Sequence, residues 1–148
     1  MPKSPLKPLL LSGNTPDPGT EIAVYGYPLG DTFGGSMKIT KGTISAPPDR
    51  KRDGMFLLDC KVNHGNSGGP MCDIRGQVVG LVAAKTGSFG GNDSYGMAIP
   101  PKTVATFLKA HLPNFHPAPP DAGKKLGSFG EVYSMVDPSV VMILKRAN

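Results

Sequence analysis

The segment best suited to chemistry is the glycine-rich octapeptide NHGNSGGP at residues 63–70. A serine that attacks a carbonyl must present its hydroxyl on a tight turn, beside backbone N–H groups that stabilise the developing oxyanion. Glycines on both sides of Ser67 permit such a turn, because glycine adopts backbone angles that other residues avoid. The segment therefore predicts an acyl-transfer site, with Ser67 as the nucleophile and the N–H groups of Gly65 and Ser67 as the oxyanion hole.

Short runs rich in apolar and β-branched residues surround this segment at nearly regular intervals. Glycine and proline separate the runs, and both residues interrupt regular structure. Short strands that alternate with turns are typical of an antiparallel barrel or sandwich. We therefore predict six strands, over residues 21–27, 37–46, 55–62, 70–74, 77–86 and 95–99.

The periodicity of the apolar residues changes after the last predicted strand. They then recur with the spacing of one helical face, and prolines at 100, 101 and 113 bound the segment. The pattern predicts a helix over residues 102–112. Its buried stripe is expected to consist of Val104, Phe107, Leu108, His111 and Leu112.

These patterns divide the chain into four segments. Residues 1–18 are rich in proline and predict an irregular N-terminal segment with an edge strand near residues 5–11. Residues 19–112 carry the predicted strands and helix. Residues 113–130 have the proline and glycine content of a linker. Residues 131–148 end in a run rich in β-branched residues, which predicts a short terminal strand.

The composition limits the classes of partner. The formal net charge is +5, but aromatic residues make up only 7% of the chain and tryptophan is absent, so no nucleic-acid-binding face is expected. No apolar run approaches the ~20 residues that a membrane-spanning helix needs. The apolar stretch at residues 9–11 is too short for a signal peptide. We therefore expect no membrane partner, and the sequence leaves the compartment open.

The cysteines and histidines give no sign of a metal site. Two cysteines, Cys60 and Cys72, are too few for a disulfide scaffold, and two free thiols are favoured over one bridge. The histidines do not pair with them at the spacing that zinc sites use. We expect neither a metal nor a cofactor.

The octapeptide and its surroundings resemble a known family. The hexapeptide GNSGGP at residues 65–70 resembles the active-serine motif of trypsin-like serine endopeptidases, and its asparagine resembles the HtrA/Deg branch. Asp59 stands where that branch has an aspartate, eight residues before the serine. Further matches occur in the same order as in the family, at residues 19–30, 39–46, 76–81 and 96–100.

This resemblance implies both a fold and a set of roles. The fold is an all-β, single six-stranded antiparallel Greek-key barrel, the second barrel of a trypsin-like peptidase, closed by a C-terminal helix. An extended peptide or protein substrate would pair with the strand edge formed by Ala83, Ala84 and Lys85. The wall of the primary specificity pocket would consist of Lys61, His64, Ala83, Ala84, Lys85, Met97 and Ala98.

The general base that the chemistry requires is missing from the matched region. In the family, the histidine and aspartate of the triad belong to the first barrel, and motifs like TNxHV and DLALL do not occur in this sequence. His64 lies on the same loop as Ser67, whereas a base must approach the hydroxyl from the other side. We therefore expect the chain to be inactive alone, and expect another chain or segment to supply the first barrel.

Two questions stay open at this stage. The chain is either half of a serine endopeptidase or a peptidase-like module that binds an extended peptide without hydrolysing it. Residues 133–143 resemble the opening of a trypsin-like domain. They are therefore the start of a second unit in a tandem array, the last strand of a permuted half that folds back on its own barrel, or an ordinary strand. Lys61 either favours an acidic residue in the primary pocket or points to solvent.

Overall fold

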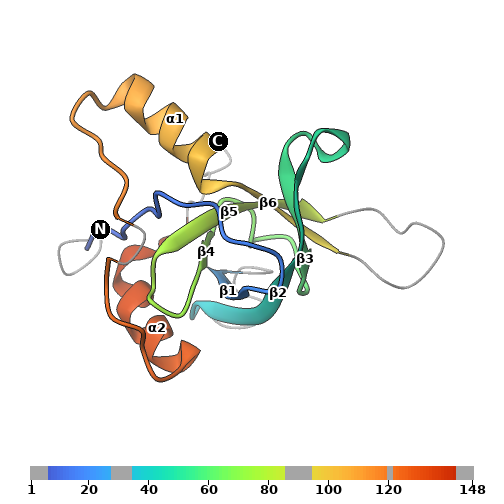
Figure 1. Ribbon diagram of the computed structural model, residues 1–148. Helices are drawn as coiled ribbons and strands as arrows, with labels where there is room; N and C mark the ends of the chain where they lie inside the picture. The colour runs from blue at the N-terminus through green and yellow to red at the C-terminus, as the bar shows by residue number, and fades with distance from the viewer. Residues whose placement is uncertain (1–6, 28–34, 86–94, 120–121, 143–148) are drawn as a thin grey trace, which may run out of the picture.

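Six strands form a closed antiparallel barrel within residues 7–27, 35–85, 95–119 and 122–142, which the computed structural model describes (Figure 1). Around the barrel the strands follow the order β1-β2-β3-β6-β5-β4. This architecture confirms the predicted six-stranded antiparallel barrel. The strands are β1 (Glu21–Gly26), β2 (Lys38–Asp49), β3 (Met55–Asp59), β4 (Pro70–Cys72), β5 (Val78–Lys85) and β6 (Gly96–Ile99).

The barrel is filled by alternate residues of its strands. Side chains alternate across a strand, so Ile22 and Val24 of β1 point inward, where they meet Phe56 and Leu58 of β3. All four side chains are at most 1% exposed. The intervening residues of β1 are also buried, because a second apolar layer covers the outside of this strand. Strand β1 is therefore packed against apolar side chains on both of its faces.

The outer layer includes the helix α2 (Phe129–Val136). Ser128 and Glu131 form a capping box: the Ser128 hydroxyl accepts from the Glu131 N–H at 3.3 Å, and the Glu131 carboxylate accepts from the Gly127 N–H at 3.0 Å. On the barrel side, the Tyr25 hydroxyl donates to the Phe129 carbonyl at 3.4 Å, and the Lys41 ammonium lies 5.2 Å from the centre of the Phe129 ring. The helix starts within the segment predicted as a linker.

The connection between the two helices runs along the barrel. Ala118 forms a parallel bridge with Ser12, and the Leu126 N–H donates to the Ile74 carbonyl at 3.0 Å. The buried Gln77 amide donates to the carbonyls of Pro119 and Ala122. These contacts fix where α2 meets the barrel.

The helix α1 (Pro101–His111) has the predicted position but a different buried stripe. Phe107 is 63% exposed, Leu112 is 52% exposed, and the exposed His111 ring stacks on Phe107 with centroids 4.3 Å apart. Val104 and Leu108 of the predicted stripe do pack against the barrel, but their neighbours on this face are Pro101 and Ala105. The helix begins at Pro101, with Pro100 as its N-cap, a position that proline tolerates because its missing N–H is not needed there.

The C-terminal segment, residues 137–142, starts with a 3₁₀ turn (Asp137–Ser139) and continues as extended chain. Residues 140–142 pair with no other described strand, because the barrel beside them is already closed. The rest of the predicted terminal strand lies outside the described residues. At the other end, Leu11 forms a parallel bridge with Val78, and residues 5 and 6 of the predicted edge strand lie outside the described range.

Candidate active site

Ser67 lies on the loop between β3 and β4, and this loop is hydrogen-bonded to β5. The Gly68 N–H donates to the Val82 carbonyl at 2.7 Å, and the Val82 N–H donates to the Gly69 carbonyl at 3.0 Å. These two bonds fix the loop at Gly68 and Gly69, directly after the serine. The Ser67 side chain is exposed, as a nucleophile must be.

The backbone before Ser67 turns with the geometry that only glycine adopts readily. Gly65 has φ of 98°, a left-handed value. The next peptide units are held by local bonds: the Asn66 N–H donates to Asn63 at 3.0 Å, and the Asn66 carbonyl accepts from the Gly69 N–H at 2.9 Å. Within the described part of the chain, the N–H groups of Gly65 and Ser67 donate to no other residue. Both N–H groups therefore lack an acceptor among the described residues.

Gly69 is required by a close approach to β1. A Cβ atom at this position would lie 2.2 Å from the Tyr25 carbonyl oxygen and 2.8 Å from the Asn66 carbonyl oxygen. Both contacts are to backbone, which cannot move aside as a flexible side chain would. The glycine therefore lets the serine loop lie directly on the strand behind it.

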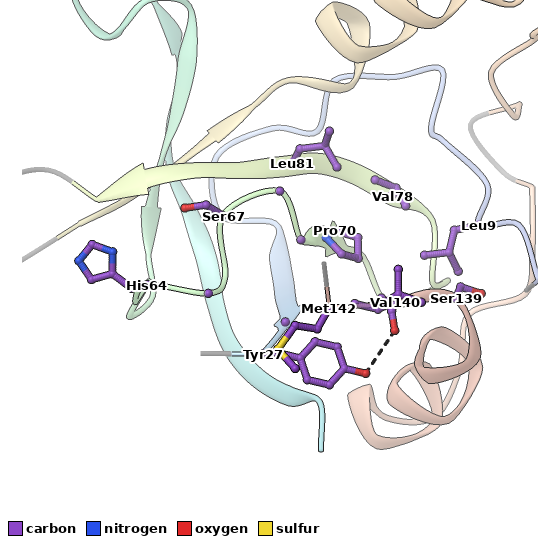
Figure 2. Close-up of a pocket in the computed structure, with 15 residues that line it drawn as sticks. Leu9, Tyr27, His64, Ser67, Pro70, Val78, Leu81, Ser139, Val140 and Met142 are labelled. Carbon is purple, nitrogen blue, oxygen red and sulfur yellow. Dashed lines mark hydrogen bonds between the residues drawn. The ribbon is translucent and has the colours of Figure 1, made fainter. Parts of the chain in front are cut away.

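The Ser67 hydroxyl donates to the Ala83 carbonyl of β5 at 3.3 Å, and no described histidine nitrogen accepts from it. His64 is exposed, and Figure 2 shows its ring projecting away from Tyr27 and Pro70. The described residues therefore place no general base on the serine. That His64 does not serve as the base stays a prediction.

An open cavity of about 730 Å³ lies beside the serine loop. Its walls come from the loop, from the ends of β1, β4 and β5, and from the C-terminal segment (Figure 2). The side chains that line it are predominantly apolar. They include Leu9, Tyr27, Pro70, Val78, Leu81, Val140, Val141 and Met142, together with the loop residues His64, Gly65, Ser67, Gly68 and Gly69.

The structure brings only some of the predicted site residues to this cavity. Gly65, Ser67 and His64 line it, whereas Lys61 is exposed outside it and Ala98 is fully buried inside the barrel. Met97 is half-buried and its backbone pairs with Ala84; Lys85 pairs with Gly96 in the same ladder. The role of these residues in a primary pocket stays a prediction.

Sequence reasoning missed the residues that form the far wall of the cavity. Leu9, Tyr27 and Val140 are far apart in the sequence, and no local periodicity links them to Ser67. One usable sequence signal is the capping box formed by Ser128 and Glu131. It predicts the helix α2, and the residues that follow this helix form part of the cavity wall.

Cys60 and Cys72 are free and buried, and they lie on opposite faces of the barrel wall. Cys60 belongs to the inner apolar cluster and Cys72 to the outer one, so no disulfide joins them. Burial, with a smaller contribution from Asp59, raises the pKa of the Cys60 thiol to about 11. Burial also raises the pKa of Cys72, and Asp73 adds to the effect.

Both thiols should therefore be unreactive in the folded protein at pH 8 and reactive after denaturation, which labelling with a disulfide reagent measures. The free energy of unfolding should fall as the pH rises from about 9 toward 11, since only the unfolded state then loses the Cys60 proton. The Cys60→Ala variant should show a smaller decline. An equally steep decline in that variant would assign the effect to other groups.

Among the described residues, no group of three or more histidine, cysteine, aspartate or glutamate side chains is arranged to hold a metal ion. No described helix is both long and apolar enough to span a bilayer.

Known proteins resemble this chain over most of its length. The family described as the trypsin-like peptidase domain matches residues 1–81. The "Serine protease HtrA-like" of Staphylococcus aureus is 32% identical over 142 residues, a match that covers 88% of this chain and 18% of the relative. A "Probable periplasmic serine endoprotease DegP-like" of Chlamydia trachomatis is 34% identical over 98 residues, covering 63% of this chain and 19% of the relative.

Solved structures show the same likeness. The structure described as "HtrA-type protease AlgW with decapeptide" superimposes with a TM-score of 0.59 at 25% identity. The match covers 72% of this chain and 33% of that chain. This chain therefore spans about a fifth of the length of the two curated relatives and a third of the solved structure.

Proposed function

Because this chain belongs to the trypsin-like peptidase family, in its HtrA-like branch, we propose that it is the nucleophile-bearing half of a serine endopeptidase. Ser67 is the nucleophile, and the N–H groups of Gly65 and Ser67 form the oxyanion hole. The single observation that carries this proposal is the exposed Ser67 hydroxyl beside two backbone N–H groups that have no described acceptor.

The reaction also requires a proton acceptor. Attack by the Ser67 oxygen on a peptide carbonyl transfers the hydroxyl proton to a base, which returns it to the leaving amine. The described residues offer a carbonyl acceptor, Ala83, but a backbone carbonyl cannot take the proton. We infer that the histidine and aspartate come from a first barrel supplied by another chain or segment. The apolar cavity beside Ser67 is the surface on which that barrel would rest.

The substrate in this account is an extended peptide that lies along the β5 edge at Ala83, Ala84 and Lys85. Two observations support this placement. First, the serine loop bonds to β5 at Val82 and Ala83, so the serine lies beside this strand. Second, a solved relative is described as an HtrA-type protease with a decapeptide.

A module that binds peptides without hydrolysing them is the second candidate. The hydrogen bond from the Ser67 hydroxyl to the Ala83 carbonyl favours this binding module, because the hydroxyl then has a hydrogen-bond acceptor without a base. The two candidates differ in whether Ser67 becomes reactive when a base is added, and not in whether the β5 edge binds peptide.

Chemical rescue distinguishes the two candidates. The cavity beside Ser67 is large enough for an imidazole ring, which can serve as an external base. We expect hydrolysis of an activated acyl ester to rise with imidazole concentration and to saturate in the native chain. The Ser67→Ala variant supplies the background from imidazole alone. If native and variant rates rise equally, Ser67 is not a nucleophile and the binding module is favoured.

A further inference from the structure

The end of β1 supports the serine loop from behind. The Tyr27 N–H donates to the Gly65 carbonyl at 3.3 Å. The two segments pack so closely that a Cβ atom on Gly26 would lie 3.0 Å from the same carbonyl oxygen and 2.9 Å from Asn66 Oδ1. A peptide unit is planar, so a contact that holds the Gly65 carbonyl also orients the peptide between Gly65 and Asn66.

The same peptide unit is held at its other side. The Asn66 N–H donates to the Asn63 carbonyl at 3.0 Å, so Tyr27 and Asn63 hold opposite edges of one plane. With this plane fixed, the direction of the Gly65 N–H depends on the two backbone angles of Gly65 alone, of which φ is 98°. Loss of the Tyr27 contact would release one of the two restraints on the first oxyanion donor.

The Tyr27 side chain extends in the opposite direction, to the C-terminal segment. Its hydroxyl donates to the Val140 carbonyl at 3.2 Å, the bond drawn in Figure 2. Burial raises the pKa of Tyr27, and the charges of Asp137 and Tyr133 add to this effect. The hydroxyl therefore stays protonated, and able to donate, over the whole neutral range.

The C-terminal segment is itself held in place by α2. Val132 and Val136 are fully buried against the barrel, at 0% exposure. The Tyr133 hydroxyl donates to the Met37 carbonyl at 2.9 Å, and the Ser139 hydroxyl donates to the Lys7 carbonyl. The position of Val140 is thus set by the packing of α2, at a distance from the serine loop.

We propose that Tyr27 is a positioning residue, which couples the seating of the C-terminal segment to the backbone of the oxyanion hole. Its hydroxyl donates to the Val140 carbonyl, and its N–H donates to the Gly65 carbonyl. The functional meaning of Gly65 rests on the proposed function. The coupling itself does not, because it is measured on the free chain without substrate, base or turnover.

Hydrogen exchange and NMR of the free chain test the coupling. In the Tyr27→Phe variant we expect the amide of residue 27 to exchange about threefold faster or more, and the Gly65 amide resonance to shift. The matched control is Thr106→Val, which also removes a hydroxyl bonded to a backbone carbonyl, but this bond, to the Lys102 carbonyl, lies within α1 and is not part of the coupling. Unchanged Gly65 and Tyr27 amides in Tyr27→Phe, or equal changes in both variants, would overturn the proposal.

A double-mutant cycle separates coupling from a local effect of the tyrosine. Val136→Ala loosens α2 and should accelerate exchange of the Tyr27 amide about threefold in the native chain, but not further in the Tyr27→Phe background. Equal acceleration in both backgrounds would contradict the proposal. If Val136→Ala fails to fold, Ser139→Ala takes its place in the cycle, because it removes the hydrogen bond from the Ser139 hydroxyl to the Lys7 carbonyl.

The outcome of the double-mutant cycle does not depend on catalysis. If the cycle shows coupling but imidazole rescue fails, Tyr27 remains a structural link and Ser67 is rejected as the nucleophile. Rescue without coupling would retain the nucleophile and reject the role of Tyr27.

Discussion

The isolated chain should hydrolyse casein on the order of 10⁶-fold more slowly than the same residues assembled with a barrel that carries a histidine and an aspartate. The physical reason is the missing proton acceptor: the Ser67 hydroxyl donates to the Ala83 carbonyl, which cannot take up its proton. The measurement is release of soluble peptides over time, with equal concentrations of serine-bearing chain in both samples.

The matched controls for this comparison are Ser67→Ala and His64→Ala. In the assembled protein, Ser67→Ala should reduce activity to the level of the isolated chain. His64→Ala should retain it, because the His64 side chain is exposed and the Ser67 hydroxyl donates to the Ala83 carbonyl and not to the His64 ring. An active isolated chain, or an inactive His64→Ala assembly, would mean that the base lies on this loop after all.

A large effect on stability should come from Gly69→Ala. The added Cβ would lie 2.2 Å from the Tyr25 carbonyl oxygen, so either β1 or the serine loop must move. We expect a loss of roughly 2 kcal/mol or more in the free energy of unfolding. This corresponds to a fall in Tm on the order of 5–10 °C. Thermal and denaturant unfolding followed by circular dichroism measure both quantities.

Ser67→Ala is the control for Gly69→Ala, because it adds no contact and changes an exposed side chain two residues away. Its free energy of unfolding should stay within about 0.5 kcal/mol of the native value. If Gly69→Ala were as stable as this control, the serine loop would not rest on β1, and the proposed path from Tyr27 to Gly65 would lose its support.

The strands could be predicted from the sequence because their signals are local. Proline and glycine interrupt the chain at each turn, and β-branched runs such as residues 78–82 leave little choice of structure between them. Ser67 and Gly65 could be singled out for the same reason, since the glycine-rich turn that carries both lies within five residues. The resemblance to the family added that the six strands close into one antiparallel barrel.

The remaining features depend on contacts between distant residues. Which residues of the apolar face of α1 are buried depends on where the barrel lies, so the periodicity predicted Val104 and Leu108 correctly but not the exposure of Phe107 and Leu112. The start of α2 was missed because the glycine-rich composition of residues 123–130 outweighed the capping box at Ser128 and Glu131. The cavity wall joins Leu9, Tyr27 and Val140, which no pattern in the sequence relates.

The most direct test is the mass of the chain after exposure to a fluorophosphonate, alone and together with a first barrel that carries the histidine and aspartate. We expect no adduct on the isolated chain and one adduct per chain in the assembly, located on Ser67. Stoichiometric labelling of the isolated chain, or an assembly that forms but leaves Ser67 unlabelled, would contradict it.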